Sequence, residues 1–136
     1  MDANVFIYSS LNRKALGDKS RSIIRDVQTG KMSALTSALT FDELIWAVKK
    51  ERGEGAGLRA GEVFLSIEGL VISDVKQDTL NSALALLREY HLNPRDSIHA
   101  ASALNSKAEY LVSEDSDFDS IGEIKRKSIL QIATSI

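Results

Sequence analysis

The sequence predicts an α/β fold in which helices cover a mostly parallel sheet. Short runs rich in β-branched residues alternate along the chain with longer segments of helical pattern. Strands separated by helices form βαβ units, whose strands run parallel. In sheets of this kind, ligands bind beyond the carboxyl ends of the strands. An acidic stretch at 114–119 follows directly after one of the apolar runs, so a site is expected there.

Length and composition set the class of protein. The 136 residues fit one domain, which we expect to span 1–136. The absence of cysteine excludes disulfides and thiolate metal sites within this chain, and we expect a cytoplasmic protein. No apolar run approaches the roughly 18 residues of a bilayer span, and no secretory signal is recognisable, so no membrane association is expected. A formal net charge of −2 argues against a generally basic nucleic-acid binder, so such contacts would be local or metal-mediated.

The first part of the chain reads as helix, helix, strand, helix. The segment VFIYSSL begins the first predicted helix. A second helix is predicted over 19–29, with Gly30 after it as a C-cap. The short run at 33–36 predicts a strand, and Ser37 can cap a helix that continues to about Lys50.

A glycine-rich segment follows at 51–62. It predicts a loop between two helices, or a mobile clamp. A further helix is predicted over 57–67, and the β-branched run at 70–75 predicts a strand.

The rest of the chain predicts two helices and two strands. Residues 76–90 have the leucine spacing of an amphipathic helix. Its predicted apolar side consists of Leu80, Leu84, Leu87 and Tyr90. A helix is predicted from Pro94 through about 106, and strands are predicted at 109–113 and 128–133.

The acidic stretch at 114–119 contains three alternating aspartates. This spacing is similar to the start of an EF-hand calcium loop. However, Ser120 stands where that loop needs glycine, and Arg126 stands where it needs glutamate. The remaining structural explanation is a solvated loop that caps a helix.

Three more segments place an acid where a helix begins or continues. Asp2 precedes an apolar helix, and Asp96 is the third residue of a helix that Asn93 can cap. An acid at that position already interacts favourably with the helix dipole. Asp42 and Glu43 lie on a helix near lysines, and the pattern does not separate them. Taken singly, each acid has an adequate structural explanation.

Taken together, the acids predict a cation site. Several carboxylates in one pocket repel one another unless a cation compensates their charge. Hard oxygen ligands in a chain without cysteine favour one or two Mg²⁺ or Mn²⁺ ions. Such a site can activate water and stabilise the charge of a phosphodiester during displacement.

Four stretches, in this order, resemble the motifs of the PIN domain family: DANVFIY, TSALTFDEL, PRDSIHAASAL and LVSEDSDFD. The resemblance extends over nearly the whole chain, and the third and fourth stretches are fairly specific in combination. It implies a three-layer α/β/α fold with a mostly parallel central sheet of four or five strands. Only Met1 precedes Asp2, where the family has an apolar strand, so the first strand is expected to be short or missing.

The resemblance also implies roles for individual residues. The catalytic acids implied are Asp2, Glu43, Asp96 and Asp115. The metal ligands implied are Asp2, Asp96, Asp115 and Asp117. Asn4 and Ser113 match polar residues that orient the acids, whereas His99 is expected to be a packed helix residue and not a catalyst. Glu114 and Asp119 are expected to be solvated.

Single-domain PIN proteins of this size resemble the VapC toxins of type II toxin–antitoxin pairs. The resemblance therefore implies an Mg²⁺- or Mn²⁺-dependent endoribonuclease, with RNA as substrate, a cognate antitoxin as partner and a homodimer as assembly. The segment 51–62 and its flanking helices are the expected antitoxin clamp. The basic residues expected to contact RNA are Arg13, Lys14, Lys19, Arg21, Arg25, Lys49, Lys50 and Arg52.

Two other functions compete with this interpretation. The first is a non-catalytic PIN-like domain that binds RNA or protein. The second is a metal-dependent phosphatase of the haloacid-dehalogenase type, which needs D-x-D after an apolar strand; here Asn4 stands in place of the second acid. The chain has neither the G-x-S-x-G of a serine hydrolase nor a phosphate-binding P-loop motif.

Overall fold

Six α-helices dominate the computed structural model, which describes residues 1–135. Their bounds are α1 Ala3–Leu11, α2 Ala15–Gln28, α3 Leu39–Arg52, α4 Glu54–Leu65, α5 Gln77–Glu89 and α6 Pro94–Asn105. The strands are β1 Ala34–Ser37, β2 Leu70–Ser73, β3 Leu111–Val112 and β4 Arg126–Lys127. Two short 3₁₀ helices complete the described part, η1 Ser116–Ser120 and η2 Ile129–Gln131.

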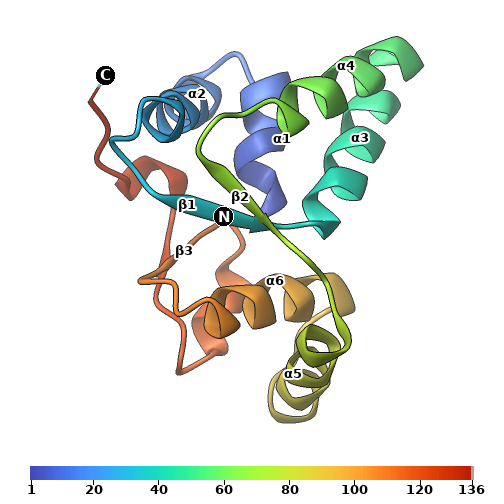
Figure 1. The fold of residues 1–136 in the computed structure, drawn as a ribbon, viewed down its shortest axis with the longest axis vertical. Helices are drawn as coiled ribbons and strands as arrows, with labels where there is room; N and C mark the ends of the chain where they lie inside the picture. Colours follow the sequence, from blue (N-terminus) through green and yellow to red (C-terminus); the bar gives the residue numbers. More distant parts are fainter. Residues whose placement is uncertain (136) are drawn as a thin grey trace.

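The elements form three layers with a thin β layer in the middle (Figure 1). Helices α1 to α4 lie on one side of the strands, and α5 and α6 lie on the other. The strands pair as two parallel ladders, β1 with β2 and β3 with β4. The predicted α/β class with parallel pairing is therefore confirmed, although each strand has only two to four residues.

Met1 and Asp2 connect the two ladders. The α-amino group of Met1 donates to the carbonyl of Leu35 in β1 at 2.7 Å. The N–H of Asp2 donates to the carbonyl of Val112 in β3 at 3.0 Å. The first two residues thus take the position of a central strand between β1 and β3. Neither residue is part of an assigned strand, in agreement with the expectation that the first strand is short or missing.

Each face of the β layer has its own hydrophobic core. The core beneath α1 to α4 is centred on Val5, Phe6, Ile23, Val27, Leu44, Val48 and Phe64. The rings of Phe6 and Phe64 meet edge to face, with centroids 5.2 Å apart. The core beneath α5 and α6 consists of Ala83, Leu86, Ala100, Ala101, Ala103, Leu111, Phe118 and Ile121. Within residues 1–135, none of the helices combines the length and the apolar character that a bilayer crossing requires.

The glycine-rich segment is mostly helical, which corrects the predicted loop. Gly53, with φ of +90°, separates α3 from α4, and α4 then runs through the remaining glycines. A Cβ on Gly61 would lie 2.7 Å from Cδ1 of Ile45 in α3. The glycines therefore let α4 approach α3 closely. Local propensity favours a loop here, but helix packing determines the structure.

Two further predictions are wrong. The segment predicted as a strand at 128–133 contains η2 instead, and the last strand is β4, which precedes it. In α5 the buried face consists of Thr79, Ala83 and Leu86, whereas Leu80 and Leu84 are 48% and 47% exposed. Two of the three buried residues, Thr79 and Ala83, are small, which lets α5 pack closely against α6, while Leu80 and Leu84 remain outside.

The crossing of α1 and α2 leads to the first testable prediction. A Cβ on Gly17 would overlap the backbone carbonyl oxygen of Asn12, which cannot move without displacing the loop between the helices. Gly17→Ala should therefore lower the free energy of unfolding by about 1–3 kcal/mol. Gly55→Ala, on the exposed side of α4, should raise it by up to about 1 kcal/mol. Urea unfolding followed by circular dichroism measures both, and equal effects would contradict the prediction.

Candidate functional site

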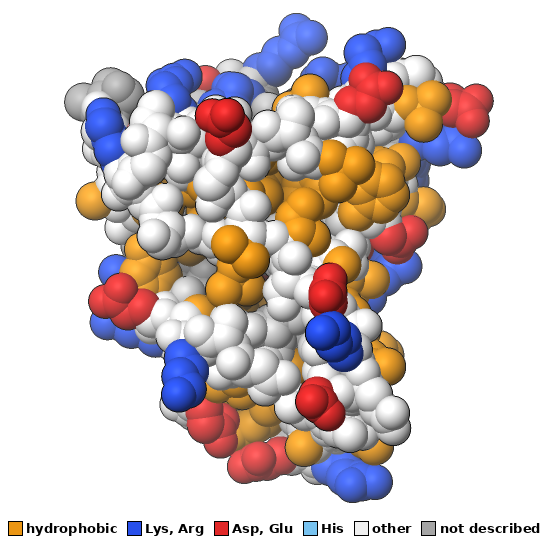
Figure 2. Space-filling model, viewed as in Figure 1, with side chains coloured by type: hydrophobic (Ala, Val, Ile, Leu, Met, Phe, Trp, Pro, Cys, Tyr) orange, Lys and Arg blue, Asp and Glu red, His pale blue; other side chains and the backbone are white. Residues whose placement is uncertain are grey.

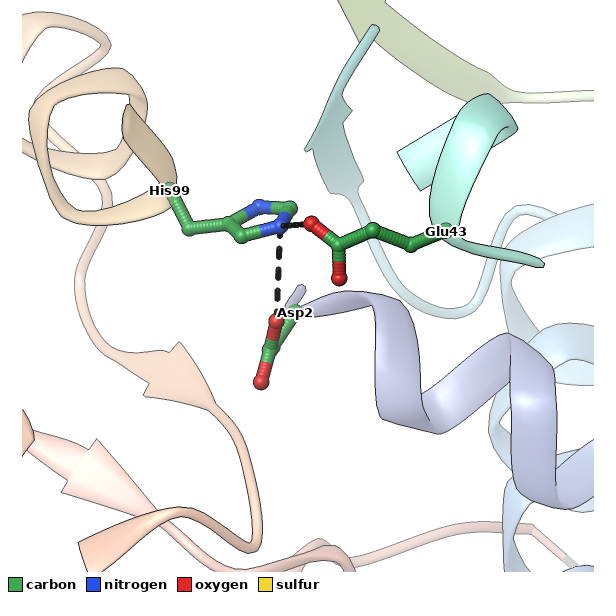
Figure 3. A group of neighbouring side chains, drawn as sticks. All are labelled: Asp2, Glu43 and His99. Carbon is green, nitrogen blue, oxygen red and sulfur yellow. Dashed lines mark hydrogen bonds and ion pairs between the residues drawn. The ribbon is translucent and has the colours of Figure 1, made fainter. Parts of the chain in front are cut away.

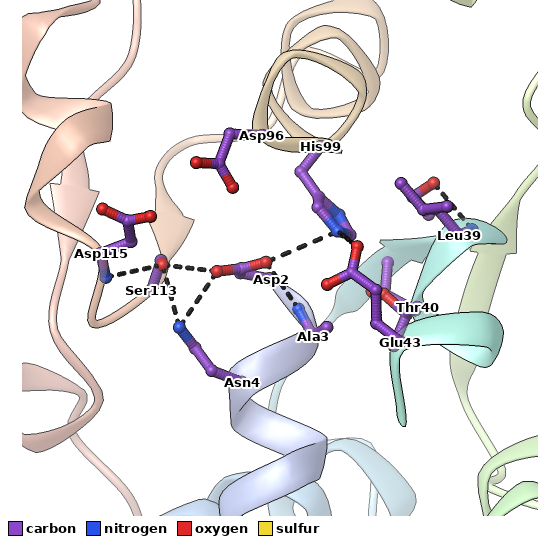
Figure 4. A network of polar contacts seen from close by, with 12 residues as sticks. Asp2, Ala3, Asn4, Leu39, Thr40, Glu43, Asp96, His99, Ser113 and Asp115 are labelled. Atoms are coloured by element: carbon purple, nitrogen blue, oxygen red, sulfur yellow. Dashed lines mark hydrogen bonds and ion pairs between the residues drawn. The ribbon is translucent and has the colours of Figure 1, made fainter. Parts of the chain in front are cut away.

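Asp2 is buried at the start of α1, and its carboxylate is fixed by hydrogen bonds (Figure 4). Oδ1 accepts from the N–H of Ala3, the first residue of α1, at 2.8 Å. Oδ2 accepts from Nδ2 of Asn4 at 3.0 Å and from Oγ of Ser113 at 2.7 Å. Asn4 also donates to Ser113 Oγ at 3.3 Å. Asn4 and Ser113 thus hold the carboxylate of Asp2 in one orientation.

Glu43 reaches the same region from α3 and meets His99 of α6 (Figure 3). Nε2 of His99 lies 2.8 Å from Oε1 of Glu43 and 3.5 Å from Oδ1 of Asp2. Nδ1 of His99 is buried without a partner in the described part of the chain. Because a carboxylate can only accept, Nε2 carries the proton of this hydrogen bond and donates it to Glu43.

The structure separates Glu43 from its neighbour Asp42, which the sequence pattern could not do. The Asp42 side chain is 67% exposed and lies 3.9 Å from Nη2 of Arg95. The Glu43 side chain is only 17% exposed. Glu43 is therefore the acid that points into the site.

Asp96 enters the site from the first turn of α6. Its N–H donates to Oδ1 of Asn93 at 2.9 Å, and Nδ2 of Asn93 donates to Oδ2 of Asp96 at 2.7 Å. Ala100 and Ala101 on the same helix are fully buried, so α6 lies close against its neighbours. The predicted Asn93 cap and the small-residue face are both present, and together they hold Asp96 rigidly.

The acidic stretch after β3 turns back as η1. Asp115 caps this turn, because its Oδ1 accepts from the N–H of Asp117 at 2.9 Å. The N–H of Asp115 donates to Ser113 Oγ at 3.0 Å, which ties the turn to the Asp2 network. Phe118, which stands between Asp117 and Asp119 in the sequence, is fully buried and anchors the turn in the core beneath α5 and α6.

Two groups of candidate ligands therefore lie side by side in the site. Ligand atoms of Asp2, Glu43 and His99 lie within 4.8 Å of one another, and so do those of Asp96, Asp115 and Asp117. Figure 4 shows Asp2, Asp96, Glu43 and Asp115 arranged around one space. Four segments far apart in the sequence thus bring their acids together, as expected from the sequence.

The electrostatics of the site reflect this crowding. Burial, and then the negative charges of Asp115 and Asp2, raise the pKa of Asp96 to about 7. A carboxylic acid that keeps its proton to such a pH lacks a compensating cation. The donor set consists mainly of carboxylate oxygens, which suits Mg²⁺ or Mn²⁺. The residues present therefore fit a divalent cation.

The basic residues predicted to contact RNA lie away from these acids. Arg13 and Lys14 follow the far end of α1, about 15 Å from Asp2 along the helix axis. Arg21 already donates to the carbonyls of Ser9 and Asn12, each at 3.0 Å, and to Asp18. Lys49 is exposed on α3, about 9 Å along the axis from Glu43.

Sequence reasoning missed two cations near the acids. Arg95, 63% exposed beside Asp96, is a cation at the rim of the site. Nη1 of Arg126 donates to the carbonyl of Ser113 at 3.0 Å, while Nε and Nη2 bind Asp119. Only the position of Arg95 next to Asp96 could have been noticed in the sequence.

Sequence reasoning also missed contacts of three residues that it had named, His99, Glu114 and Asp119. His99 is packed as expected, but its contact with Glu43 was not foreseen. The available signal was that His99 follows Asp96 by three residues, which places both side chains on one face of α6. Glu114 accepts from the N–H of Ile129, and Asp119 binds Arg126. Asp119 is exposed as expected, whereas Glu114 is half-buried and bonded to the backbone, which corrects the expectation for Glu114.

Comparison with known proteins places this geometry in context. The family model described as the PIN domain matches residues 1–124. A search of curated protein sequences found no match. Among solved structures, the VapBC2 complex of Rickettsia felis, bound to a DNA fragment from its promoter, aligns with a TM-score of 0.73 and 18% identity. That alignment covers 94% of this chain and 98% of the other.

Two further structures have a similar fold. VapC20 of Mycobacterium tuberculosis, described as a toxin that cleaves the sarcin–ricin loop, aligns with a TM-score of 0.71 and 17% identity, covering 89% of this chain and 92% of that one. A toxin–antitoxin complex from Klebsiella pneumoniae aligns with a TM-score of 0.65 and 20% identity, covering 91% and 92%. At these identities the likeness establishes the fold.

Proposed function

The chain belongs to the PIN domain family, and on this premise we propose that it is a metal-dependent endoribonuclease of the VapC toxin type. The observation that carries the proposal is the convergence of acids from four chain segments on one space. The raised pKa of Asp96 supports it, because the carboxylates repel one another when no cation lies between them. The similar fold of three VapC or toxin–antitoxin structures adds to this support.

In this proposal Asp2, Asp96 and Asp115 hold one or two Mg²⁺ or Mn²⁺ ions, with Asp117 at the exposed edge. When bound, such an ion activates water for attack on phosphorus and stabilises the charge of the phosphodiester. Asn4 and Ser113 fix the rotamer of Asp2, so its oxygens are preorganised for a ligand. The Nε2–H of His99 binds Glu43 and keeps that carboxylate directed towards Asp2.

Metal affinity should increase with pH up to about 7. In the metal-free protein the proton of Asp96 leaves with a pKa of about 7, so a cation has to displace it at lower pH. The apparent Kd for Mn²⁺ should fall about tenfold per pH unit below that value and level off above about pH 8. Calorimetric titration at several pH values measures this, and a flat profile between about pH 5 and 7 would contradict it.

Cleavage of RNA tests the function itself. A mixed pool of end-labelled single-stranded RNAs is incubated with the chain and Mn²⁺, Mg²⁺ or EDTA. Metal-dependent internal cuts that leave 5′-phosphates are expected, and EDTA should abolish them. A folded chain that binds Mn²⁺ but leaves every RNA intact would favour the non-catalytic alternative. Hydrolysis of a phosphomonoester without any RNA cleavage would favour the phosphatase.

We also propose that an antitoxin covers the apolar surface of α3 and α4. The large exposed hydrophobic residues there are Phe41, Trp46, Leu58, Val63 and Leu65, which are between 41% and 63% exposed. Figure 2 shows hydrophobic side chains gathered over the part of the molecule that carries α3, α4 and β2. Such clusters on a small protein are typical of interaction sites. Helix α4, and not a loop, is then the expected contact element of the clamp.

A further inference from the structure

Helices α3 and α6 are bridged at the site by two polar contacts, one buried and one exposed. The buried contact joins Nε2 of His99 to Oε1 of Glu43 at 2.8 Å. The exposed contact joins Nη2 of Arg95 to Oδ2 of Asp42 at 3.9 Å, and these two side chains are 63% and 67% exposed. The second contact therefore lies at the rim of the site, on the same two helices that carry Glu43 and Asp96.

Each partner of this exposed pair is the chain neighbour of an acid that points into the site. Arg95 precedes Asp96 in α6, and Asp42 precedes Glu43 in α3. Successive residues of an α-helix point in directions about 100° apart, so a helix that turns one side chain into the site turns its neighbour away from it. Arg95 is thus held beside the acids without joining them.

The position of Arg95 leaves its guanidinium available to a ligand. Burial, and then the charges of Asp115 and Asp2, raise the pKa of Asp96 to about 7, although Arg95 is the next residue in the chain. The ion pair of Arg95 with Asp42 is long and exposed, and such pairs contribute little to stability because water and salt screen them. Arg95 can therefore exchange Asp42 for a stronger partner.

The other arginine near the acids is already engaged. Nε and Nη2 of Arg126 donate to Asp119, and its Nη1 donates to the carbonyl of Ser113. The Arg126 side chain is only 18% exposed. Of the two arginines, Arg95 is the one whose planar set of donors faces solvent, and this set matches two oxygens of a phosphate group. A polyanion that approaches the acids therefore meets Arg95 first.

We propose that Arg95 binds a phosphate group of the RNA substrate, next to the phosphodiester that is cleaved, and releases Asp42 as it does so. The proposal rests on the proposed nuclease function, because it names a substrate contact of the same site. Asp42 then has the opposite effect on the substrate. Its carboxylate competes with the phosphate for Arg95 and repels the incoming backbone.

Steady-state cleavage distinguishes this contact from a purely structural ion pair. The probe is the single-stranded RNA of the mixed pool that the wild-type chain cuts fastest with Mn²⁺. Arg95→Gln should raise KM about tenfold and leave kcat nearly unchanged, because a charge-assisted contact to bound substrate is lost. Asp42→Asn should lower KM about two- to threefold, because Arg95 is no longer held. A structural pair would make both substitutions act in the same direction, since each removes the same contact.

Salt dependence and a matched variant identify the contact as one with phosphate. The plot of log kcat/KM against log salt concentration should become shallower by about 0.7 in Arg95→Gln, and Arg95→Lys, which keeps the charge, should retain the wild-type slope. Arg59→Gln makes the same change at an exposed residue of α4, a helix that supplies none of the acids of the site. It should leave KM and the slope as in wild type.

Stabilisation by Mn²⁺ shows whether Arg95 acts on the substrate or on the metal site. Mn²⁺ should raise the melting temperature of Arg95→Gln as much as that of wild type, because the carboxylates are unchanged. The proposal is overturned if this stabilisation is lost, if Asp42→Asn raises KM, or if Arg95→Gln has the KM and salt slope of Arg59→Gln while wild type cleaves RNA. A wild-type chain that cuts no RNA would overturn the nuclease function together with this contact.

Discussion

Asp96→Asn is expected to slow RNA cleavage strongly while making the metal-free protein more stable. The neutral amide cannot replace a carboxylate ligand, and the charge stabilisation lost is several kcal/mol, so cleavage should fall by about 10²–10³-fold. The same change removes a carboxylate whose ionisation is opposed by burial and by Asp115 and Asp2. The unfolding free energy at about pH 8 should increase by about 1–3 kcal/mol.

The pH dependence of that stability gain has a definite sign. Folding raises the pKa of Asp96 from its ordinary value of 3.8 to about 7, so its favourable contribution to stability is complete below about pH 4 and is lost as pH rises through 7. The variant should therefore be more stable than wild type at about pH 8 and no more stable at about pH 4. Thermal unfolding in EDTA at both pH values measures the difference.

Asp119→Asn is the matched control. Asp119 is exposed, and its hydrogen bond to Arg126 lowers its pKa, the opposite of the Asp96 shift. Neutralising it should slightly lower the melting temperature and leave cleavage near the wild-type rate. An Asp96→Asn protein that cleaves RNA as fast as the Asp119→Asn protein would contradict the assignment of Asp96.

Phe118→Ala is expected to cause the largest loss of stability. The side chain is fully buried in the core beneath α5 and α6, so its removal should cost about 3–5 kcal/mol. That is a large share of the 5–15 kcal/mol typical of a domain. Because Phe118 anchors η1, the loss should extend to Asp115 and Asp117, and Mn²⁺ should no longer raise the melting temperature.

Two further variants test whether the expected loss of stability comes from the packing of Phe118 or would follow any loss of apolar side-chain volume. Phe118→Leu keeps most of the apolar volume and should retain the stabilisation by Mn²⁺ at a modest cost in stability. Leu84→Ala removes a half-exposed side chain from α5 and should change stability by less than about 1 kcal/mol. If Phe118→Ala unfolded at the same urea concentration as Leu84→Ala, the anchoring role of Phe118 would be wrong.

Local sequence signals were sufficient where a short-range contact determines the structure. Asn93 and Pro94 start α6 as their capping preferences require, and Asp96 follows in the first turn. The parallel strand pairs followed from the alternation of apolar runs and helices. The convergence of the acids on one space followed from their placement at strand ends and helix starts.

Long-range packing determines what the sequence could not predict. Glycines that favour a loop became the contact face of α4, because Ile45 of α3 packs against them. Leu80 and Leu84 of α5 turned outward, and Ala83 and Leu86 form the face that packs against α6. The contact of His99 with Glu43 joins residues 56 positions apart, and it depends on how α3 and α6 are placed across the β layer. No local pattern encodes such a distance.

Binding of Mn²⁺ by the purified chain tests the central claim, that these acids form a divalent-cation site. Isothermal titration calorimetry at about pH 8 compares wild type, Asp96→Asn and Asp119→Asn. We expect saturable binding of one or two ions per chain, lost in Asp96→Asn and retained in Asp119→Asn. A folded wild-type chain that binds no Mn²⁺, or that binds it equally well after Asp96→Asn, would contradict the account.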